Sequence, residues 1–145
     1  MRTLLISAAE PSGDRLAAEL LGALGELGPV RARGIAGPRM REAGCEAIAM
    51  MEDVCAMGLA EVLARLGPIK QARSAMRECI EEGADALVVV DAPDLHLPLA
   101  RQASRRGIPA IGYVSPQIWA WRSGRSASAV SINCSTSLSS CGGRG

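Results

Sequence analysis

Ala86-Leu87-Val88-Val89-Val90-Asp91-Ala92-Pro93-Asp94 is the stretch that decides the predicted fold. Leu87 to Val90 are four consecutive apolar residues without alternating polar ones, as in a strand covered on both faces of a parallel sheet. Pro93 ends this strand because proline has no N–H to donate to a ladder. Asp91 therefore lies at the carboxyl end of a buried strand, where open α/β sheets bind ligands. The alternative is that Asp91 is a turn residue, with Asp94 as the N-cap of the next helix.

Strands and helices alternate along the rest of the chain. Besides the strand that runs into Asp91, the sequence predicts strands over Thr3–Ser7, Val30–Ile35, Glu46–Met50 and Ala110–Val114. Apolar residues at helical spacing predict helices over Arg15–Leu27, Met57–Leu66, Ile69 to about Gly83, and Leu95–Arg106, with a helical turn over Arg39–Ala43. This order predicts an α/β fold with a doubly wound, Rossmann-like parallel sheet.

The composition is that of a soluble globular domain. The chain has 145 residues, of which 48% are hydrophobic and 21% charged. Its net charge of +1 gives no overall field that would attract nucleic acid, so we expect no nucleic-acid partner. The apolar start is shorter than the core of a signal peptide, and no stretch approaches the roughly 20 apolar residues of a membrane span. These features favour a cytoplasmic protein.

The cysteines and the single histidine do not form a metal-binding pattern. The five cysteines are odd in number and never spaced as CxxC, and His96 is the one histidine. A zinc site would need more ligands at closer spacing, so we expect no metal and buried free thiols in a reducing compartment.

Polar side chains fill the loop predicted after the first strand. Glu10, Ser12 and Asp14 lie there beside Gly13, but the glycine patterns of dinucleotide sites and P-loops are absent. Two carboxylates would repel a phosphate, whereas carboxylates and a hydroxyl suit the hydroxyl groups of a sugar. The alternative is a capped turn, because Ser12 and Asp14 are both good helix caps.

Residues 113–122 hold every aromatic side chain of the protein. Tyr113, Trp119 and Trp121 lie with Arg122 just after a predicted strand. Two tryptophans beside a cation would form a stacking wall at the carboxyl edge of the sheet, and we favour this binding role over ordinary loop packing. After Arg125 the sequence becomes rich in serine, cysteine and glycine. We therefore predict a domain over 1–125 and an aberrant or disordered tail over 126–145, from an altered reading frame or a truncated gene.

Six motifs occur in a fixed order between residue 3 and about residue 125. They are Ala9-Glu10-Pro11-Ser12-Gly13-Asp14, Gly34-Ile35-Ala36-Gly37-Pro38-Arg39-Met40, Met57-Gly58-Leu59-Ala60-Glu61-Val62-Leu63, Asp91-Ala92-Pro93-Asp94, Tyr113-Val114-Ser115-Pro116 and Trp119-Ala120-Trp121-Arg122. As a set they resemble the lipid-A-disaccharide synthase family, which are glycosyltransferases of the GT-B architecture. The family usually has Gly where Ala9 stands, and commonly Asn where His96 stands, so the role of His96 is left open.

The resemblance implies an inverting transfer without a cofactor. In it, 2,3-diacylglucosamine passes from its UDP derivative to 2,3-diacylglucosamine 1-phosphate, and UDP leaves. Asp91 matches the family's proposed general base, and Glu10, Ser12 and Asp14 match the acceptor side of the cleft. Further substrate contacts are expected within the matching motifs, at Met57, Glu61, Tyr113, Ser115, Trp119, Trp121 and Arg122.

The apolar positions after residue 57 have two interpretations. Core packing explains most such stripes, but the resemblance implies contact with the membrane surface or acyl chains through Leu59, Val62, Leu63, Leu66 and Ile69. The chain would then lie on the inner face of the bacterial inner membrane. Because the second GT-B domain supplies most of the UDP-sugar pocket, we expect this polypeptide to be inactive alone. A flavodoxin-like domain that binds a small ligand without turnover is the alternative.

Overall fold

The computed structural model of the chain describes residues 1–55, 66–90 and 93–113. Asp91, the helix predicted over Met57–Leu66 except for its last residue, and the segment from Val114 onward lie outside the described residues. The predicted boundary at residue 125 also lies outside them and stays a prediction.

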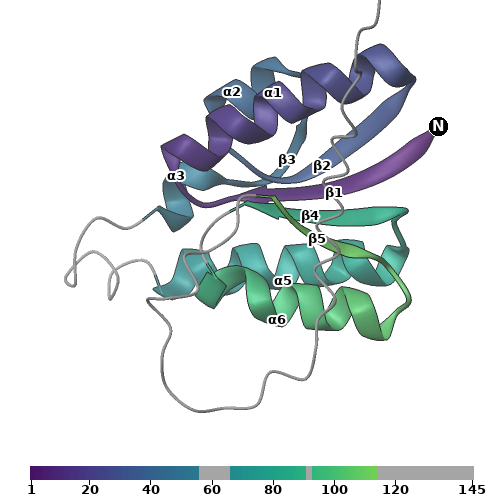
Figure 1. Cartoon of the computed structure of the whole chain (residues 1–145). Helices are drawn as coiled ribbons and strands as arrows, with labels where there is room; N and C mark the ends of the chain where they lie inside the picture. The colour runs from purple at the N-terminus through teal and green to yellow at the C-terminus, as the bar shows by residue number, and fades with distance from the viewer. Residues whose placement is uncertain (56–65, 91–92, 114–145) are drawn as a thin grey trace, which may run out of the picture.

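Five parallel strands form one sheet in the order β3-β2-β1-β4-β5 (Figure 1). They are β1 (Arg2–Ala8), β2 (Val30–Ala36), β3 (Glu46–Met50), β4 (Ala86–Val90) and β5 (Ala110–Tyr113). The ladders are parallel throughout, with β1 between β2 and β4. The predicted strands are confirmed to within one or two residues, including the short third strand.

Helices cover both faces of the sheet, as the doubly wound prediction requires. They are α1 (Pro11–Leu27), α2 (Pro38–Glu42), α3 (Met51–Val54), α5 (Leu66–Glu82) and α6 (Pro93–Arg105). Figure 1 shows α1 and α2 on one face and α5 and α6 on the other. The predicted α/β, Rossmann-like fold is confirmed.

The central strand β1 contributes to two separate cores because its side chains alternate between the faces. Leu4 and Ile6 belong to the cluster beneath α1 and α2. Leu5 belongs to the cluster beneath α5 and α6, and Ser7 has the same parity as Leu5. Burial on both faces explains why the strand shows no alternation in its sequence.

Four helices, α1, α2, α5 and α6, begin one to four residues earlier than predicted, in each case with a proline in the first turn. Helix α1 starts at Pro11 rather than Arg15, so Ser12 and Asp14 lie in its first turn instead of a loop. Helix α5 starts at Leu66 and includes Pro68, whereas we predicted that one helix ends at Leu66 and the next begins at Ile69. A proline is tolerated there because the first amides of a helix have no partner within the helix. The four-residue helix α3 was not predicted, since it is too short to show periodicity.

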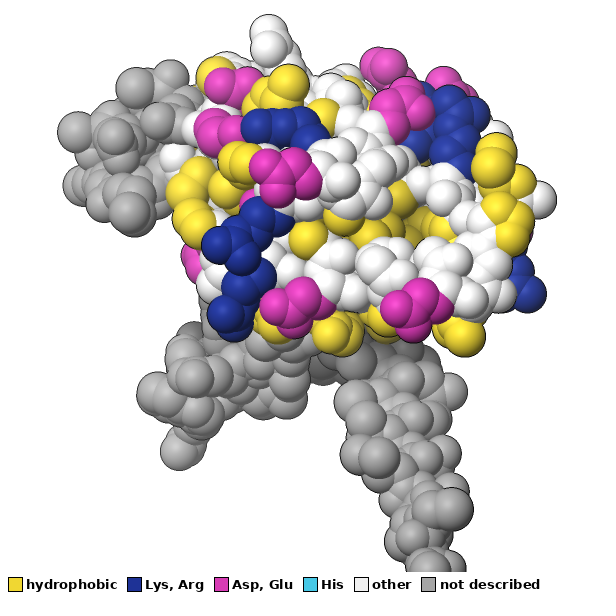
Figure 2. Space-filling model, turned by 90° about the horizontal axis from the view of Figure 1, so that it is seen from above, with side chains coloured by type: hydrophobic (Ala, Val, Ile, Leu, Met, Phe, Trp, Pro, Cys, Tyr) yellow, Lys and Arg dark blue, Asp and Glu magenta, His cyan; other side chains and the backbone are white. Residues whose placement is uncertain are grey.

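Charged side chains of both signs are interspersed over the face formed by α1 and α2, and Figure 2 shows this face. Among the described residues, no helix is both long enough and apolar enough to cross a bilayer.

Candidate active site at the carboxyl edge of the sheet

The strand order places a switch point between β1 and β4. Strands β2 and β3 lie on one side of β1, and β4 and β5, which come later in the chain, lie on the other side. Connections on the two sides therefore leave the carboxyl ends of β1 and β4 in opposite directions, and ligands of open α/β sheets bind at such a switch point. Among the described residues, Ala9, Glu10 and the start of α1 follow the carboxyl end of β1 at this switch point.

Glu10 and Ser12 lie just after the carboxyl end of β1 and have exposed side chains. Glu10 occupies the N-cap position of α1, but its side chain makes no capping hydrogen bond. Ser12 is in the first turn and is also exposed. A carboxylate that accepts hydrogen bonds and a hydroxyl that both donates and accepts them are suited to a polyhydroxylated ligand. The prediction that they contact the sugar acceptor is not tested by the structure and stays a prediction.

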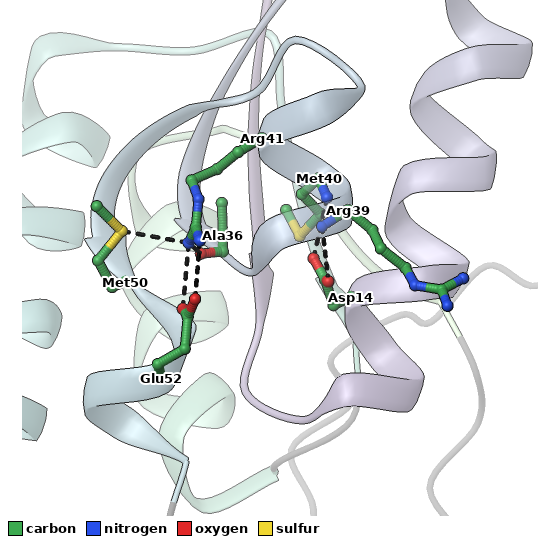
Figure 3. A network of polar contacts seen from close by, with 7 residues as sticks. All are labelled: Asp14, Ala36, Arg39, Met40, Arg41, Met50 and Glu52. Atoms are coloured by element: carbon green, nitrogen blue, oxygen red, sulfur yellow. Dashed lines mark hydrogen bonds and ion pairs between the residues drawn. The ribbon is translucent and has the colours of Figure 1, made fainter.

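Asp14 differs from these two because its carboxylate is buried and already hydrogen-bonded. Its side chain is 3% exposed. Its Oδ2 accepts a hydrogen bond from the backbone N–H of Arg39, and its Oδ1 accepts one from that of Met40, each at 3.0 Å (Figure 3). These amides belong to the first turn of α2, so Asp14 caps a helix from a different part of the chain. The cap predicted for the local turn is thus absent, while contact with substrate stays a prediction.

Gly37 leaves the space that the Asp14 carboxylate occupies. A Cβ on this glycine would lie 2.4 Å from the Asp14 Cγ, closer than real Cβ atoms approach. The first two sequence motifs are therefore parts of one structural unit: Asp14 comes from the first motif, and Gly37, Arg39 and Met40 come from the second. Sequence reasoning missed this link because the partners are 25 and 26 residues apart.

Arg41 connects the ends of β2, α2 and α3. Its Nη1 donates to the Ala36 carbonyl at 2.9 Å, and its Nη2 donates to Glu52 Oε1 at 2.8 Å. A second bond from Nη1 to Glu52 Oε2 at 3.1 Å makes the pair bidentate (Figure 3). The hydrogen bond from Arg41 lowers the pKa of the Glu52 carboxyl, because it stabilises the charged form.

Ser7 and His96 form a second polar pair that the sequence analysis did not find. The Ser7 Oγ and the His96 Nε2 are 2.7 Å apart, and both residues are buried. Ser7 lies on β1 one residue before its end, and His96 is in the first turn of α6. The sequence offered two signals for this pair. His96 is the one histidine of the chain and lies in a predicted helix, and Ser7 is the one serine of the buried first strand.

The other predicted site residues fall into three groups. Tyr113 is half-buried at the end of β5 and is opposite Val90, the last residue of β4. Leu66 is 45% exposed, whereas Ile69 packs against the core beneath α5 and α6. The remaining predicted contacts lie outside the described residues and stay predictions: Asp91, Met57, Glu61, Ser115, Trp119, Trp121, Arg122, Leu59, Val62 and Leu63.

Within residues 1–55, 66–90 and 93–113, no group of three or more histidine, cysteine or acidic side chains could hold a metal ion. Cys45, Cys55 and Cys79 are free thiols, of which Cys45 and Cys79 are buried. Burial raises the pKa of the Cys45 thiol to about 12, because it penalises the thiolate. Cys45 is therefore protonated at neutral pH and is a poor nucleophile.

Comparison with known proteins found a matching family model and several similar relatives. A family model described as lipid-A-disaccharide synthetase matches residues 4–136. The lipid-A-disaccharide synthase of Koribacter versatilis (strain Ellin345) is 46% identical over 128 residues, which cover 86% of this chain and 34% of that relative. That of Anaeromyxobacter sp. (strain K) is 48% identical over 124 residues, or 84% and 32%. That of Escherichia coli O1:K1 / APEC is 43% identical over 125 residues, or 85% and 33%. The chain spans about a third of the length of these relatives.

Proposed function

The chain belongs to the lipid-A-disaccharide synthase family, and from this we propose that it forms the acceptor-binding part of a glycosyltransferase of lipid A biosynthesis. The reaction is the transfer of 2,3-diacylglucosamine from UDP-2,3-diacylglucosamine to 2,3-diacylglucosamine 1-phosphate, with release of UDP. The observation that carries this proposal is the pair of exposed polar side chains, Glu10 and Ser12, at the switch point of the sheet. They lie within the region matched by the family model.

Asp91 acts as the general base in this proposal. In the sequence it directly follows Val90, the last residue of β4. Its carboxylate takes the proton of the acceptor 6-hydroxyl as that oxygen attacks the anomeric carbon of the donor. The bond to UDP breaks on the opposite face of the sugar, so the configuration inverts and a β-1,6 linkage forms. A carboxylate within hydrogen-bonding reach of the hydroxyl is suited to this task.

The relatives' additional length supplies the donor pocket in this proposal, as the second domain of a GT-B architecture. The domain boundary at residue 125 is part of the same proposal. We propose that the 145 residues alone do not complete the transfer, because they span about a third of the relatives' length. Incubation of the purified chain with both substrates should give no disaccharide, and detectable product would contradict this.

A diacylated substrate also requires access to a lipid surface. Leu66 is exposed in the first turn of α5, at the end of the apolar stripe that begins at Leu59. We propose that this stripe meets the inner face of the bacterial inner membrane, with the protein peripheral on the cytoplasmic side. Ile69 has a different role, since it packs against the core.

The test of the proposed function is acceptor binding by the 145-residue chain. Amide chemical shifts would be followed by NMR while diacylglucosamine 1-phosphate is added in detergent micelles. We expect shifts at Glu10 and Ser12 that saturate, and weaker binding by Glu10→Gln. Glu26→Gln is the matched control, because Glu26 is exposed at the far end of the same helix.

Separate titrations with UDP and with flavin mononucleotide complete this experiment. The proposal predicts no saturable shifts at Glu10 and Ser12 with either of them. Tight binding of the flavin, without binding of the acylated sugar, would overturn the proposal and favour a flavodoxin-like binding domain.

A further inference from the structure

Met50 is the methionine of the described strands and helices that is open to solvent. It is the last residue of β3, and its side chain is 45% exposed. Three other methionines are 5% exposed or less: Met40, Met51 and Met76. An accessible thioether can be oxidised to a sulfoxide, whereas a buried one is protected by the side chains packed around it. Met50 is therefore the position within the fold where a soluble oxidant reaches a thioether.

The Met50 sulfur also contacts Arg41, the residue that connects the ends of β2, α2 and α3. Arg41 Nη1 lies 3.2 Å from Met50 Sδ. The same nitrogen donates to the Ala36 carbonyl at 2.9 Å and to Glu52 Oε2 at 3.1 Å (Figure 3). This nitrogen carries two N–H groups, so three acceptors share two hydrogens. The thioether is the weakest acceptor of the three.

Oxidation converts this weak acceptor into a strong one. With hydrogen peroxide, the sulfur lone pair attacks one peroxide oxygen and the O–O bond breaks. That oxygen forms the S=O bond, and the other leaves as water, so the sulfur loses the two electrons that the peroxide gains. The sulfoxide is polar, and its oxygen accepts a hydrogen bond from Arg41 Nη1. It therefore competes for N–H groups that already have acceptors.

Glu52 is the acceptor that loses this competition. Ala36 is fully buried, so its carbonyl would be left unsatisfied if Arg41 moved away from it. The Glu52 side chain is 47% exposed, so water can replace the bond to Oε2 at little cost. The bond from Arg41 Nη2 to Glu52 Oε1 remains, and the bidentate pair becomes a single hydrogen bond.

We propose that Met50 is an oxidation site for hydrogen peroxide and related two-electron oxidants, and that its sulfoxide displaces Glu52 Oε2 from Arg41. The modification weakens the attachment of α3 to β2 and α2 without removing it. Methionine sulfoxide reductases, supplied with a thiol reductant, reverse it. The inference is independent of the proposed function, because none of these residues takes part in the proposed transfer.

The first test locates the oxidised positions in the purified 145-residue chain. Tandem mass spectrometry of its peptides follows the addition of one oxygen to each methionine during exposure to hydrogen peroxide. We expect Met50 to be oxidised about tenfold faster than the three buried methionines, because packing shields their sulfur atoms. Equal rates at Met50 and at the buried methionines would overturn the proposal.

The second test asks whether the sulfoxide competes with Glu52. The hydrogen bond from Arg41 lowers the pKa of the Glu52 carboxyl, and carbon NMR of that carboxyl gives the pKa as the midpoint of a pH titration. After oxidation we expect the midpoint to rise toward the ordinary pKa of a glutamate, and to return after treatment with the reductase. A midpoint that stays in place while Met50 is fully oxidised would contradict the competition for Arg41.

Met50→Leu is the matched control, because leucine has a similar volume and cannot be oxidised. The variant keeps every other sulfur of the chain, including the exposed Met1 and the thiol of Cys55. Peroxide should therefore leave the Glu52 midpoint of this variant unchanged. An equal rise in Met50→Leu and in the unmodified chain would assign the effect to another sulfur, and the proposal would be wrong.

Discussion

Glu10 and Ser12 are exposed to solvent, whereas Asp14, two residues further along the same helical turn, is buried. The first two side chains lie at the surface just after the carboxyl end of β1, and Glu10 makes no capping hydrogen bond. Both carboxylate oxygens of Asp14 accept hydrogen bonds from backbone N–H groups of α2. One short motif therefore combines two tasks: it presents polar groups to a ligand, and it fixes the neighbouring helix. The predictions below separate these tasks, beginning with the largest expected effect on stability.

Replacing Asp14 should destabilise the fold most. Asp14→Ala leaves the backbone N–H groups of Arg39 and Met40 without their acceptor, the first in a partly buried and the second in a buried position. The cost of unsatisfied buried donors and a lost charge-assisted bond is about 3 kcal/mol. Urea denaturation gives the free energy of unfolding. Glu26→Ala, at an exposed position of α1, is the control and should change it little; equal losses in the two variants would contradict the assigned role.

Gly37→Ala should cost about 2 kcal/mol, because the new methyl group meets the Asp14 carboxylate and overpacking of this kind costs roughly 1–3 kcal/mol. In an Asp14→Ala background the same change should cost much less, since the obstructing group is gone. Gly25→Ala offers a control of opposite sign. Nothing lies within 4 Å of a Cβ at Gly25 in α1, so this change should stabilise the helix. Additivity of the Asp14 and Gly37 changes would contradict the proposed contact.

Glu52→Gln should have a smaller effect, below about 1 kcal/mol at neutral pH, because the ion pair with Arg41 is partly exposed to solvent. The folded state lowers the pKa of Glu52. Its contribution is therefore complete above the unfolded pKa of about 4.3 and is lost as the pH falls through the lower folded value. Urea midpoints of the two proteins should differ at pH 7 and converge in acid. A difference that persists unchanged below both pKa values would contradict the assignment.

Glu10→Gln and Ser12→Ala should leave the free energy of unfolding within about 0.5 kcal/mol of the unmodified chain, as is usual for exposed positions. Acceptor binding should nevertheless weaken by about tenfold for Glu10→Gln, since a hydrogen bond to a charged group contributes roughly 1.5 kcal/mol or more. Calorimetric titration with the acylated sugar phosphate measures this. Loss of stability without loss of binding would assign these side chains to the fold instead of the site.

Much of the fold was predictable because it depends on local patterns. The uninterrupted valines of β4 are typical of a buried strand, and the leucines of α1 recur at the spacing of a helix. Both elements were therefore predicted, with small errors at their ends. The errors have a common cause. A proline in a first turn starts a helix when tertiary packing favours it and ends one when it does not, and the local sequence is the same in both cases.

The candidate site was predictable only in part. The placement of Glu10 and Ser12 near the carboxyl edge follows from the order of strand and helix, which the sequence shows directly. The capping of α2 by Asp14 and the pairing of Ser7 with His96 do not follow from it. Their partners are 25 and 89 residues apart, and no local pattern relates them.

The sequence by itself determined which segments are strands and helices, that the sheet is parallel, and which family the six motifs resemble. Each of these depends on the spacing of residue types along the chain. Only the tertiary structure decided which polar side chains face a ligand and which hold the scaffold. Serine, aspartate and histidine can do either, and the choice depends on whether buried backbone or side-chain groups come within hydrogen-bonding distance when the elements pack together.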